Sequence, residues 1–325
     1  STLLASSAAS DVYKRQILTV LFVFVLNFVL IRLAPGDPVT ILAGQDNPSQ
    51  ELIDIMKAKY GLDKSIPEQL VVYLGNVIKG DLGTSIIYGR PVMDIIMERL
   101  GPTLMLSLTG AVIALVLGTL LAIWASRNPG GVVDNIISYI AYVLYSMPGF
   151  WLGLIMILFF ASKLGWLPTA GMENARAGYT GIKHVLDVAK HLVLPSSALA
   201  LVGVPAYFRI GRSSMMQVIK SDYVNTFKAA GLDKGKIYRK YLFREAMLPT
   251  ITTFGIRLAY IIGGSAATEI VFAWPGMGTL VLSAISSRDY PLLMGNYLIL
   301  SISVAVWMIL VDLIYAVADP RIRLS

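Results

Sequence analysis

Long apolar segments separated by polar loops constrain this chain more than any other feature of its sequence. The segment "TLMLSLTGAVIALVLGTLLAIWA" runs from residue 103 to residue 125 without a charged side chain. A helix needs about 20 mostly apolar residues to cross a bilayer. Hydrophobic residues make up 56% of the chain and charged residues only 14%, against roughly 25% charged residues in soluble domains. These features predict an all-α membrane protein.

Six segments are candidate transmembrane helices, at residues 17–33, 103–125, 136–164, 192–218, 251–272 and 297–317. The third is interrupted at "SMPGFWLG", and the fourth contains Pro195 and Pro205. Membrane helices tolerate such residues because neighbouring helices satisfy the freed backbone groups. Small residues at Gly149 and Gly153, and in "GGSAA", favour close helix packing.

The first residues differ in character from the rest of the chain. "STLLASSAASDVYKRQ" lacks an initiator methionine and resembles translated sequencing-adapter sequence. We therefore expect residues 1–16 to be non-native, and we leave Lys14 and Arg15 out of the orientation argument.

Basic residues fix the expected orientation. The formal net charge is +7, and the most basic short connection is residues 221–250, "SDYVNTFKAAGLDKGKIYRKYLFREAMLPT". Loops rich in Lys and Arg stay in the cytoplasm. With six spans, both termini are then cytoplasmic. Arg127, Arg321 and Arg323 agree with this orientation, as do Arg209, Arg212 and Lys220.

Residues 34–100 are expected to form an external helical loop that leans acidic. Ser49 is a cap for a helix reaching about residue 60, and Ser65 with Pro67 starts another that ends near Gly80. "RPVMDIIMERLGPT" predicts a short amphipathic helix leading into the second span. Its apolar side consists of Val92, Ile95, Ile96 and Leu100.

Motifs for bond-breaking chemistry are absent from the sequence. "AAGLDKGK" lacks the glycine spacing and the final hydroxyl residue of a P-loop, so this chain does not cradle ATP. His184 and His191 would lie ~10 Å apart along a helix, too far to share one metal ion, and we expect both to be solvated. The chain has no cysteine. The sequence therefore predicts neither an enzyme nor a metal or cofactor site.

Ionisable residues at membrane depth are functional candidates. Arg257, Glu269 and Asp312 lie there. We expect Arg257 to face a polar cavity or a partner helix. We expect Glu269 to order the following "VFAWPGMGTL", in which a turn precedes a short apolar helix. The turn residues are Pro275, Gly276 and Gly278. A proton-coupled transporter usually carries denser chains of acids and histidines than this.

Several motifs together resemble the permease subunits of ABC importers, most closely the dipeptide, oligopeptide and nickel transport branch. They are "RLAPGDPV" (32–39), "GDLGTSIIYGRPVMDIIMERLGPTL" (80–104), the basic segment 221–250, "TEIVFAWPGMGTLV" (268–281), "RDYPLLMG" (288–295) and "DLIYAVADPRIRL" (312–324). The resemblance covers nearly all of the chain after residue 16. It implies the type I ABC importer transmembrane fold, with residues 101–325 as the core permease domain.

The same resemblance implies a function and a set of partners. The chain would form half of the translocation pathway for peptides or similar small solutes across the cytoplasmic (inner) membrane of a prokaryote. Its partners would be a homologous permease, two ATP-binding cassette subunits, an extracytoplasmic solute-binding protein and the bilayer. Nucleic acid is not among them. It would bind no cofactor itself, because the partner subunits use the ATP.

Family members dock on the ATPase through a cytoplasmic loop before the fifth span, which carries the so-called EAA motif. By resemblance, coupling helices lie at about residues 221–248 here. The docking residues are Tyr223, Phe227, Ala229, Ala230, Gly231 and Leu232. The sequence departs from the motif at Asn225, Thr226 and Phe227, which stand in place of Glu-Ala-Ala. Gly231 permits a sharp turn between helices.

Other interpretations remain open from the residues alone. The resemblance leaves dipeptides, oligopeptides, nickel and glutathione as substrates. A secondary transporter or channel that works without an ATPase would need an ion-coupling site, for which the charges are sparse. A membrane-anchored structural or signalling protein would use the basic loop to bind anionic lipid.

Overall fold

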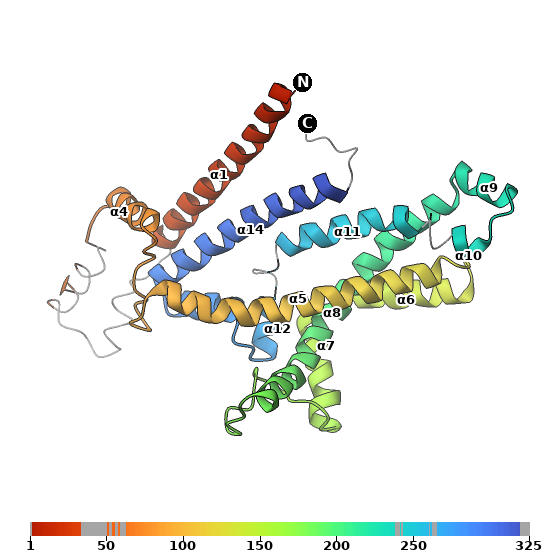
Figure 1. Ribbon diagram of the computed structural model, residues 1–325. Coiled ribbons are helices and arrows are strands. Elements are labelled where there is room, and N and C mark those ends of the chain that lie inside the picture. The colour runs from red at the N-terminus through yellow and green to blue at the C-terminus, as the bar shows by residue number, and fades with distance from the viewer. Residues whose placement is uncertain are drawn as a thin grey trace. The chain divides into compact units, whose positions relative to one another are not determined.

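The computed structural model describes residues 2–33, 51, 54, 55, 58, 63–237, 241, 243–259, 261 and 265–318, with the backbone alone for residues 2–17, 228, 234, 244, 259 and 312–318. Within these ranges every regular element is a helix (Figure 1). The chain divides into two compact units, which we describe separately. The first unit is Ser1–Gly101 with Gly276–Ser325, and the second unit is Pro102–Pro275.

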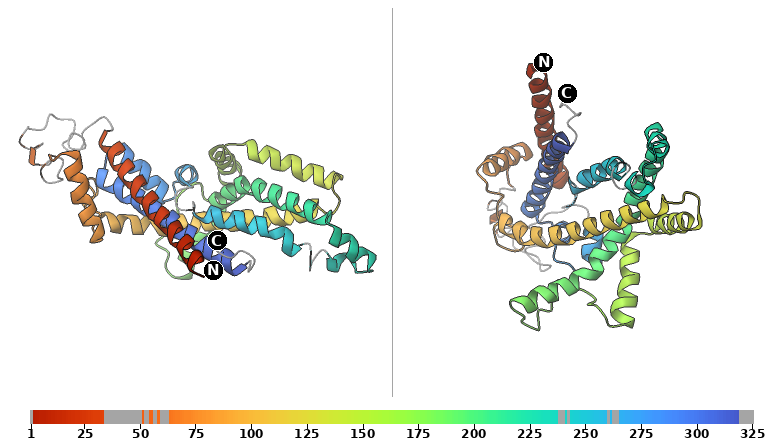
Figure 2. Two further views of the ribbon diagram at one scale, coloured as in Figure 1. Left: turned by 90° about the horizontal axis from the view of Figure 1, so that it is seen from above. Right: turned by 45° about the vertical axis from the view of Figure 1, so that its right-hand side comes forward.

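In the first unit, two long helices pack side by side. The elements are α1 (Thr2–Leu33), α4 (Ile66–Ile78), the start of α5 (Val92–Ala125), α13 (Met277–Ser286) and α14 (Tyr290–Ala318). α1 contacts α14, and Figures 1 and 2 show the two helices next to each other. The Phe24 and Phe28 side chains of α1 are buried.

The predicted helix start at Ser65 is confirmed. Ser65 caps α4, and its backbone N–H donates to Glu68 Oε2 over 3.0 Å while its hydroxyl donates over 2.8 Å. The two hydrogen bonds from Ser65 lower the pKa of Glu68. α4 ends at Ile78, close to Gly80 as expected. The other helix predicted in this loop, residues 49–60, falls mostly outside the described residues.

The short amphipathic helix predicted before the second span is not a separate element. α5 runs from Val92 to Ala125 without a break and contains Pro102. Proline removes one backbone hydrogen bond and a membrane helix can absorb that loss, so the pattern before Pro102 continues into the span. Val92, Ile95 and Ile96 are buried, as their periodicity predicted.

Asp289 fixes the start of the last helix. Its carboxylate is fully buried and accepts hydrogen bonds from Ser85 Oγ over 2.5 Å and from the backbone N–H groups of Ile86 and Ile87 over 3.2 Å each. It also accepts from Leu292 N at the first turn of α14. α14 therefore begins at Tyr290, earlier than the predicted 297. The "RDYPLLMG" motif is thus a helix cap that also holds the loop before α5.

The second unit contains the rest of α5 and eight further helical elements. They are α6 (Val132–Ser146), α7 (Gly149–Met156), the π-helix η1 (Ile157–Lys163), α8 (Ile182–Ile219), α9 (Asp222–Ala229), α10 (Lys234–Lys236), α11 (Phe243–Ala259) and α12 (Ala266–Val271). α8 contacts α6, α7, α11 and α12, so it is the central helix of this unit.

The predicted interruption of the third span is confirmed. α6 and the helix pair α7–η1 are bent by 103° at a short break. Met147 and Pro148 both have extended backbone there, which is the conformation that a proline favours for itself and its predecessor. This pair is either one broken span or a re-entrant segment.

Among the described residues, three helices are long and apolar enough to cross a membrane: α5, α8 and the Tyr290–Val311 part of α14. The described apolar part of α1, Leu18–Leu33, is shorter. The segment predicted as the fifth span, 251–272, is described as α11 and α12 in two pieces. The structure therefore gives a helical membrane fold with three clear spans, and the count of six stays a prediction.

α8 begins earlier than the predicted residue 192, so both histidines lie on it instead of in a loop. His191 is not solvated, because only 8% of its side chain is exposed. Its Nδ1 lies 3.5 Å from Asp187 Oδ1. His184 pairs with Glu173 and is exposed, as expected.

Small residues at every fourth position of α5 bring it against α8. They are Gly110, Ala114, Gly118 and Ala122. A methyl group at Gly118 would lie 2.7 Å from the Tyr207 Cβ, and one at Gly110 would lie 2.8 Å from the Leu199 Cβ. From the α8 side, a methyl at Gly203 would lie 2.8 Å from the Ala114 Cβ. The two backbones are therefore in close contact.

We predict that Gly118→Ala destabilises the second unit. The added methyl overlaps Tyr207 and the Val204 carbonyl, and overpacking of this kind costs about 1–3 kcal/mol. The thermal unfolding midpoint of the detergent-solubilised protein measures the loss. Gly101→Ala is the matched control, because it lies on the same helix and has nothing within 4 Å of the new methyl. Equal midpoints for the two variants would contradict the close contact.

Candidate functional site

The basic segment, residues 221–250, folds back onto the end of α8. Ser221 ends that helix, since its backbone N–H and its hydroxyl both donate to the Val218 carbonyl. α9 follows directly, α10 comes next, and α11 then returns along α8 (Figure 1). The buried residues of this fold are Met215, Val218, Val224, Ile237 and Ala246.

The six predicted docking residues separate into two groups. Tyr223, Phe227 and Leu232 are partly buried against the apolar cluster beneath α9. The Phe227 ring contacts Tyr223, with centroids 5.7 Å apart, and Tyr241, with centroids 4.5 Å apart. The other group, residues 229–231, is exposed. The first group anchors α9, and the second forms its free end.

Gly231 ends α9 in a Schellman motif. Its φ of +73° lies in the left-handed region, which favours glycine. The Leu232 N–H donates to the Phe227 carbonyl over 3.1 Å, and the Ala230 N–H donates to the Thr226 carbonyl over 2.9 Å. Contact between the residue after the glycine and the helix usually accompanies this motif, and Leu232 and Phe227 both pack on the same apolar cluster. "KAAGL" therefore encodes a sharp helix end.

A hydrogen bond holds α9 against α11. The Tyr223 hydroxyl donates to the Glu245 carboxylate. Burial raises the pKa of Tyr223, and the bond to Glu245 acts in the same direction. Asp233 caps the next turn, since its Oδ2 accepts from the Lys236 N–H over 2.9 Å. The segment is thus a defined structure and more than a stretch of basic charge.

An ion pair between the half-buried Arg212 and the buried Asp134 joins the end of α8 to the start of α6. Arg212 Nε lies 2.6 Å from Asp134 Oδ1, and Arg212 Nη2 lies 2.6 Å from Asp134 Oδ2. Asp134 is 1% exposed and also accepts from the Gly130 N–H over 2.8 Å. The sequence analysis counted Arg212 only as a cytoplasmic charge. The available signal was Asp134 itself, an acidic residue in the first turn of an otherwise apolar helix.

Glu269 is the centre of a buried polar network. Its Oε1 accepts from the hydroxyls of Thr103 and Ser265 over 2.8 Å each. Ser107 Oγ donates to Ser265 Oγ over 3.1 Å. The side chain of Glu269 has no exposed surface. The sequence analysis did not identify the three hydroxyl partners, because serine and threonine are common in membrane helices.

The backbone of Glu269 also orders the loop that follows. Its carbonyl accepts from the Trp274 N–H over 2.7 Å, and the indole Nε1 donates to the Pro102 carbonyl over 2.9 Å. Trp274 is fully buried. Pro275 follows it in the second unit. In the first unit, Gly276 is the N-cap of α13 and Gly278 lies in its first turn.

A cavity of about 360 Å³ opens between α5, α8 and α11. Its polar residues are Ser107, Tyr207, Arg257 and Ser265, and small residues form much of the remaining wall. The Arg257 guanidinium lies 5.6 Å from the Tyr207 ring centroid, and this side chain is exposed. Arg257 therefore lines a cavity whose wall is mostly apolar, with Ser107, Tyr207 and Ser265 as its other polar residues. The side chain of Asp312 lies outside the described residues.

No group of three His, Cys, Asp or Glu side chains in the described ranges is placed to hold a metal ion. The described residues thus form three features: the exposed end of α9, the Arg212–Asp134 ion pair and the cavity beside Arg257.

Comparison with protein families gives two adjoining matches. Residues 115–324 match the model described as "Binding-protein-dependent transport system inner membrane component". Residues 12–109 match the model of the N-terminal part of such membrane components.

Similar proteins span the full length of the chain. The oligopeptide transport system permease protein AppB of Bacillus subtilis (strain 168) is 35% identical over 97% of this chain and 99% of its own. The di/tripeptide transport system permease protein DppB of Pseudomonas aeruginosa is 33% identical over 93% of this chain and 94% of its own length. The glutathione transport system permease protein GsiC of Escherichia coli (strain K12) is 34% identical over 94% of this chain and 95% of its own length.

Solved structures share the fold at low sequence identity. A chain of the MetNI methionine ABC transporter in an inward facing conformation gives a TM-score of 0.54 at 20% identity, over 70% of this chain and 97% of that chain. A chain of an amino acid ABC transporter gives a TM-score of 0.53 at 13% sequence identity. The match covers 68% of this chain and 93% of that chain.

We predict that Glu269→Ala destabilises the second unit. The change leaves the buried hydroxyls of Thr103 and Ser265 without their shared acceptor, at a cost of about 1–3 kcal/mol. The thermal unfolding midpoint measures it. Glu173→Ala is the control, because it removes an exposed pair with His184 that is worth at most ~1 kcal/mol. If both variants unfold at the wild-type temperature, the network does not stabilise the fold.

Proposed function

This chain belongs to the family of binding-protein-dependent transport system inner membrane components, the permease subunits of ABC importers, and we propose that its system imports peptides. The observation that carries the substrate class is the full-length similarity to permeases of oligopeptide and di/tripeptide transport systems, at 35% and 33% identity. The chain forms one half of the pathway, and a homologous permease forms the other half. Two ATP-binding subunits and an extracytoplasmic solute-binding protein complete the system.

The basic segment is proposed as the cytoplasmic docking site for one ATPase. Its charge supports that side of the membrane, because loops rich in Lys and Arg stay inside. Six spans then place both termini in the cytoplasm of the cell, residues 34–100 outside it, and residues 101–325 in the core permease domain. The coupling helices occupy residues 221–248, with Ala229, Ala230 and Gly231 at the contact.

Movement of the ATPases would reach the pathway through α8. α9 is anchored to the end of α8 by an apolar cluster and to α11 by the Tyr223–Glu245 hydrogen bond. The Arg212–Asp134 pair ties the same end of α8 to α6. A push on α9 therefore moves α6, α8 and α11 together, as expected for rigid-body switching of packed elements.

Arg257 is proposed to meet the solute. It is exposed beside the cavity whose walls include α8, and a guanidinium binds carboxylate in a bidentate fashion. A peptide offers a carboxylate at its C-terminus. Glu269 is proposed to fix α12 against α5 and to order the loop that leads to the turn at Pro275, Gly276 and Gly278.

Glutathione is the second candidate substrate, favoured by the similarity to GsiC. Glutathione is a small peptide-like acid, so Arg257 would bind its carboxylate in the same way. Uptake by proteoliposomes that contain the whole transporter separates the two, with labelled tripeptide or labelled glutathione as the solute and the other as competitor.

We predict that Gly231→Val uncouples transport. Valine strains the left-handed turn by about 1–2 kcal/mol and changes the exposed end of α9. Peptide uptake and the ATPase activity stimulated by the binding protein should both fall several-fold in the reconstituted transporter. Gly165→Val is the matched control, since Gly165 is an exposed glycine with φ +63° in a loop proposed to lie outside the cell. Wild-type coupling in Gly231→Val, or an equal loss in Gly165→Val, would contradict the docking role.

We predict that Arg257→Gln lowers the uptake of a peptide acid about tenfold, because the carboxylate loses its cationic partner. Uptake of the same peptide as its C-terminal amide should change little. Arg90→Gln is the control, since Arg90 is exposed and pairs with Glu98. An equal loss for the acid and the amide would show that Arg257 does not read the carboxylate.

A further inference from the structure

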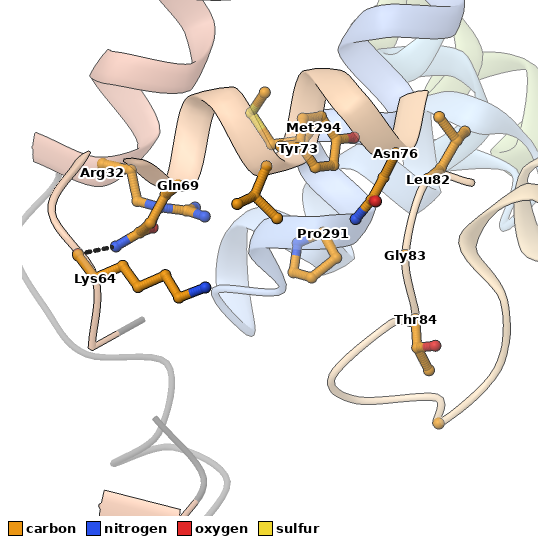
Figure 3. Close-up of a pocket in the computed structure, with 12 residues that line it drawn as sticks. Arg32, Lys64, Gln69, Tyr73, Asn76, Leu82, Gly83, Thr84, Pro291 and Met294 are labelled. Carbon is orange, nitrogen blue, oxygen red and sulfur yellow. Dashed lines mark hydrogen bonds between the residues drawn. The ribbon is translucent and has the colours of Figure 1, made fainter. Parts of the chain in front are cut away.

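A second cavity, of about 390 Å³, lies in the first unit where α1 ends and α14 begins (Figure 3). The end of α1, one side of α4, the loop after α4 and the first turn of α14 form its wall. Its polar side chains include Arg32, Lys64, Tyr73, Asn76 and Thr84. None of the described residues that line it is acidic, so the cavity is basic.

Arg32 is held in place but has donors to spare. Its guanidinium carbon lies 4.8 Å from the Phe28 ring centroid and 5.2 Å from that of Tyr290, and its Nε donates to Gln69 Oε1 over 2.6 Å. Its Nη1 is buried and has no hydrogen-bond partner in the described part of the chain. Leaving a buried donor of a charged group unmet is costly. A preorganised guanidinium with free donors is suited to an oxyanion.

Two further donors belong to the same cavity. The Tyr73 hydroxyl is buried and also lacks a partner among the described residues, while its ring stacks on Phe24 with centroids 5.6 Å apart. Burial raises the pKa of Tyr73, so the hydroxyl remains a neutral donor. Figure 3 shows the Lys64 side chain extending in the direction of Pro291, and both residues line the cavity. The acidic neighbour of Tyr73, Asp81, accepts from the Gly83 N–H.

An apolar groove of about 410 Å³ is formed by the same three helices, α1, α4 and α14. Met294 lines the cavity, and Leu298, one turn further along α14, lines the groove. Every residue that lines the groove is apolar, including Phe24 on α1 and Val77 on α4. From Leu298 to Ile309 it follows α14 for ~16 Å, close to half of the ~30 Å hydrocarbon core of a bilayer.

We propose that the cavity and the groove together bind one membrane phospholipid. Arg32 and Lys64 hold its phosphate, with Tyr73 as a neutral donor, and one acyl chain lies in the groove along α14. A basic cavity for a head group and an apolar groove of one leaflet's depth match the two parts of a lipid. A soluble anion would leave the groove unused. The exposed apolar residues of α4, such as Ile78, which is 85% exposed, place the same helix against lipid.

Native mass spectrometry tests the assignment on the full chain purified with the subunits that accompany it. The delipidated protein is titrated with phosphatidylglycerol, with a diacylglycerol of the same acyl chains, and with glycerol phosphate. We expect one retained phosphatidylglycerol and at least tenfold weaker binding of both fragments. Arg32→Gln and Ala305→Trp, which fills the groove, should each weaken lipid binding at least tenfold.

The matched controls are Arg90→Gln, an exposed arginine that pairs with Glu98 and does not line the cavity, and Leu310→Trp, an exposed apolar position of α14 that does not line the groove. Both should bind lipid like the wild type. If Arg32→Gln fails to fold, Ala305→Trp and the lipid series still decide the matter. Three results would overturn the proposal: equal binding by all variants, glycerol phosphate binding as tightly as the lipid, or displacement of the lipid by a peptide acid but not by its amide. No transport is measured, so the outcome is independent of the proposed substrate.

Discussion

The close approach of α5 and α8 is the contact on which the second unit depends. Gly110 and Gly118 leave no room for a methyl group on the α5 side, and Gly203 leaves none on the α8 side. Helices in a bilayer gain little from apolar burial, because the lipid is as apolar as the side chains. Close backbone contact supplies the packing energy instead. α6, α7, α11 and α12 are then arranged around α8.

The contact between α5 and α8 holds two polar interactions of the second unit in place. The Glu269 network joins α5 to α12, and the Arg212–Asp134 pair joins α8 to α6. Asp134 and Glu269 are buried, and a buried polar group is stable only where its hydrogen-bond partners are placed for it. Their geometry therefore requires that the helices stay in register. The cavity beside Arg257 is a consequence of the same contact, since Ala114 and Gly203 form part of its wall.

Much of this arrangement is predictable from the sequence, and the exceptions have physical reasons. Apolar length located three clear spans among the described residues, and the break at "SMPGFWLG", the cap at Ser65 and the short helix after Gly276 are confirmed. The helices α5, α8 and α14 each begin earlier than predicted. Polar and proline-containing turns continue a helix when its other turns are packed. The family resemblance is confirmed by the comparisons.

Long-range pairs were out of reach of pattern reasoning. Nothing in the spacing of residues links Asp134 to Arg212, or Asp289 to Ser85, because each pair is brought together only by the fold. The small-residue stripe of α5 was visible in the sequence, but attention went to Gly149 and Gly153. Of these, Gly153 does pack tightly, against Phe272. For the proposed docking residues, the family motif predicts the position in the chain, and only the structure separates the partly buried residues from the exposed ones.

The exposed end of α9 carries no side chain larger than a methyl group at residues 229–231. In the proposed docking role, an ATPase subunit would meet mostly backbone there, with little side-chain chemistry to distinguish one permease from another. Such recognition by shape would place weak demands on the residues just before the turn, provided that the turn itself is kept. A chain with this role would then tolerate Asn225, Thr226 and Phe227 before a retained glycine.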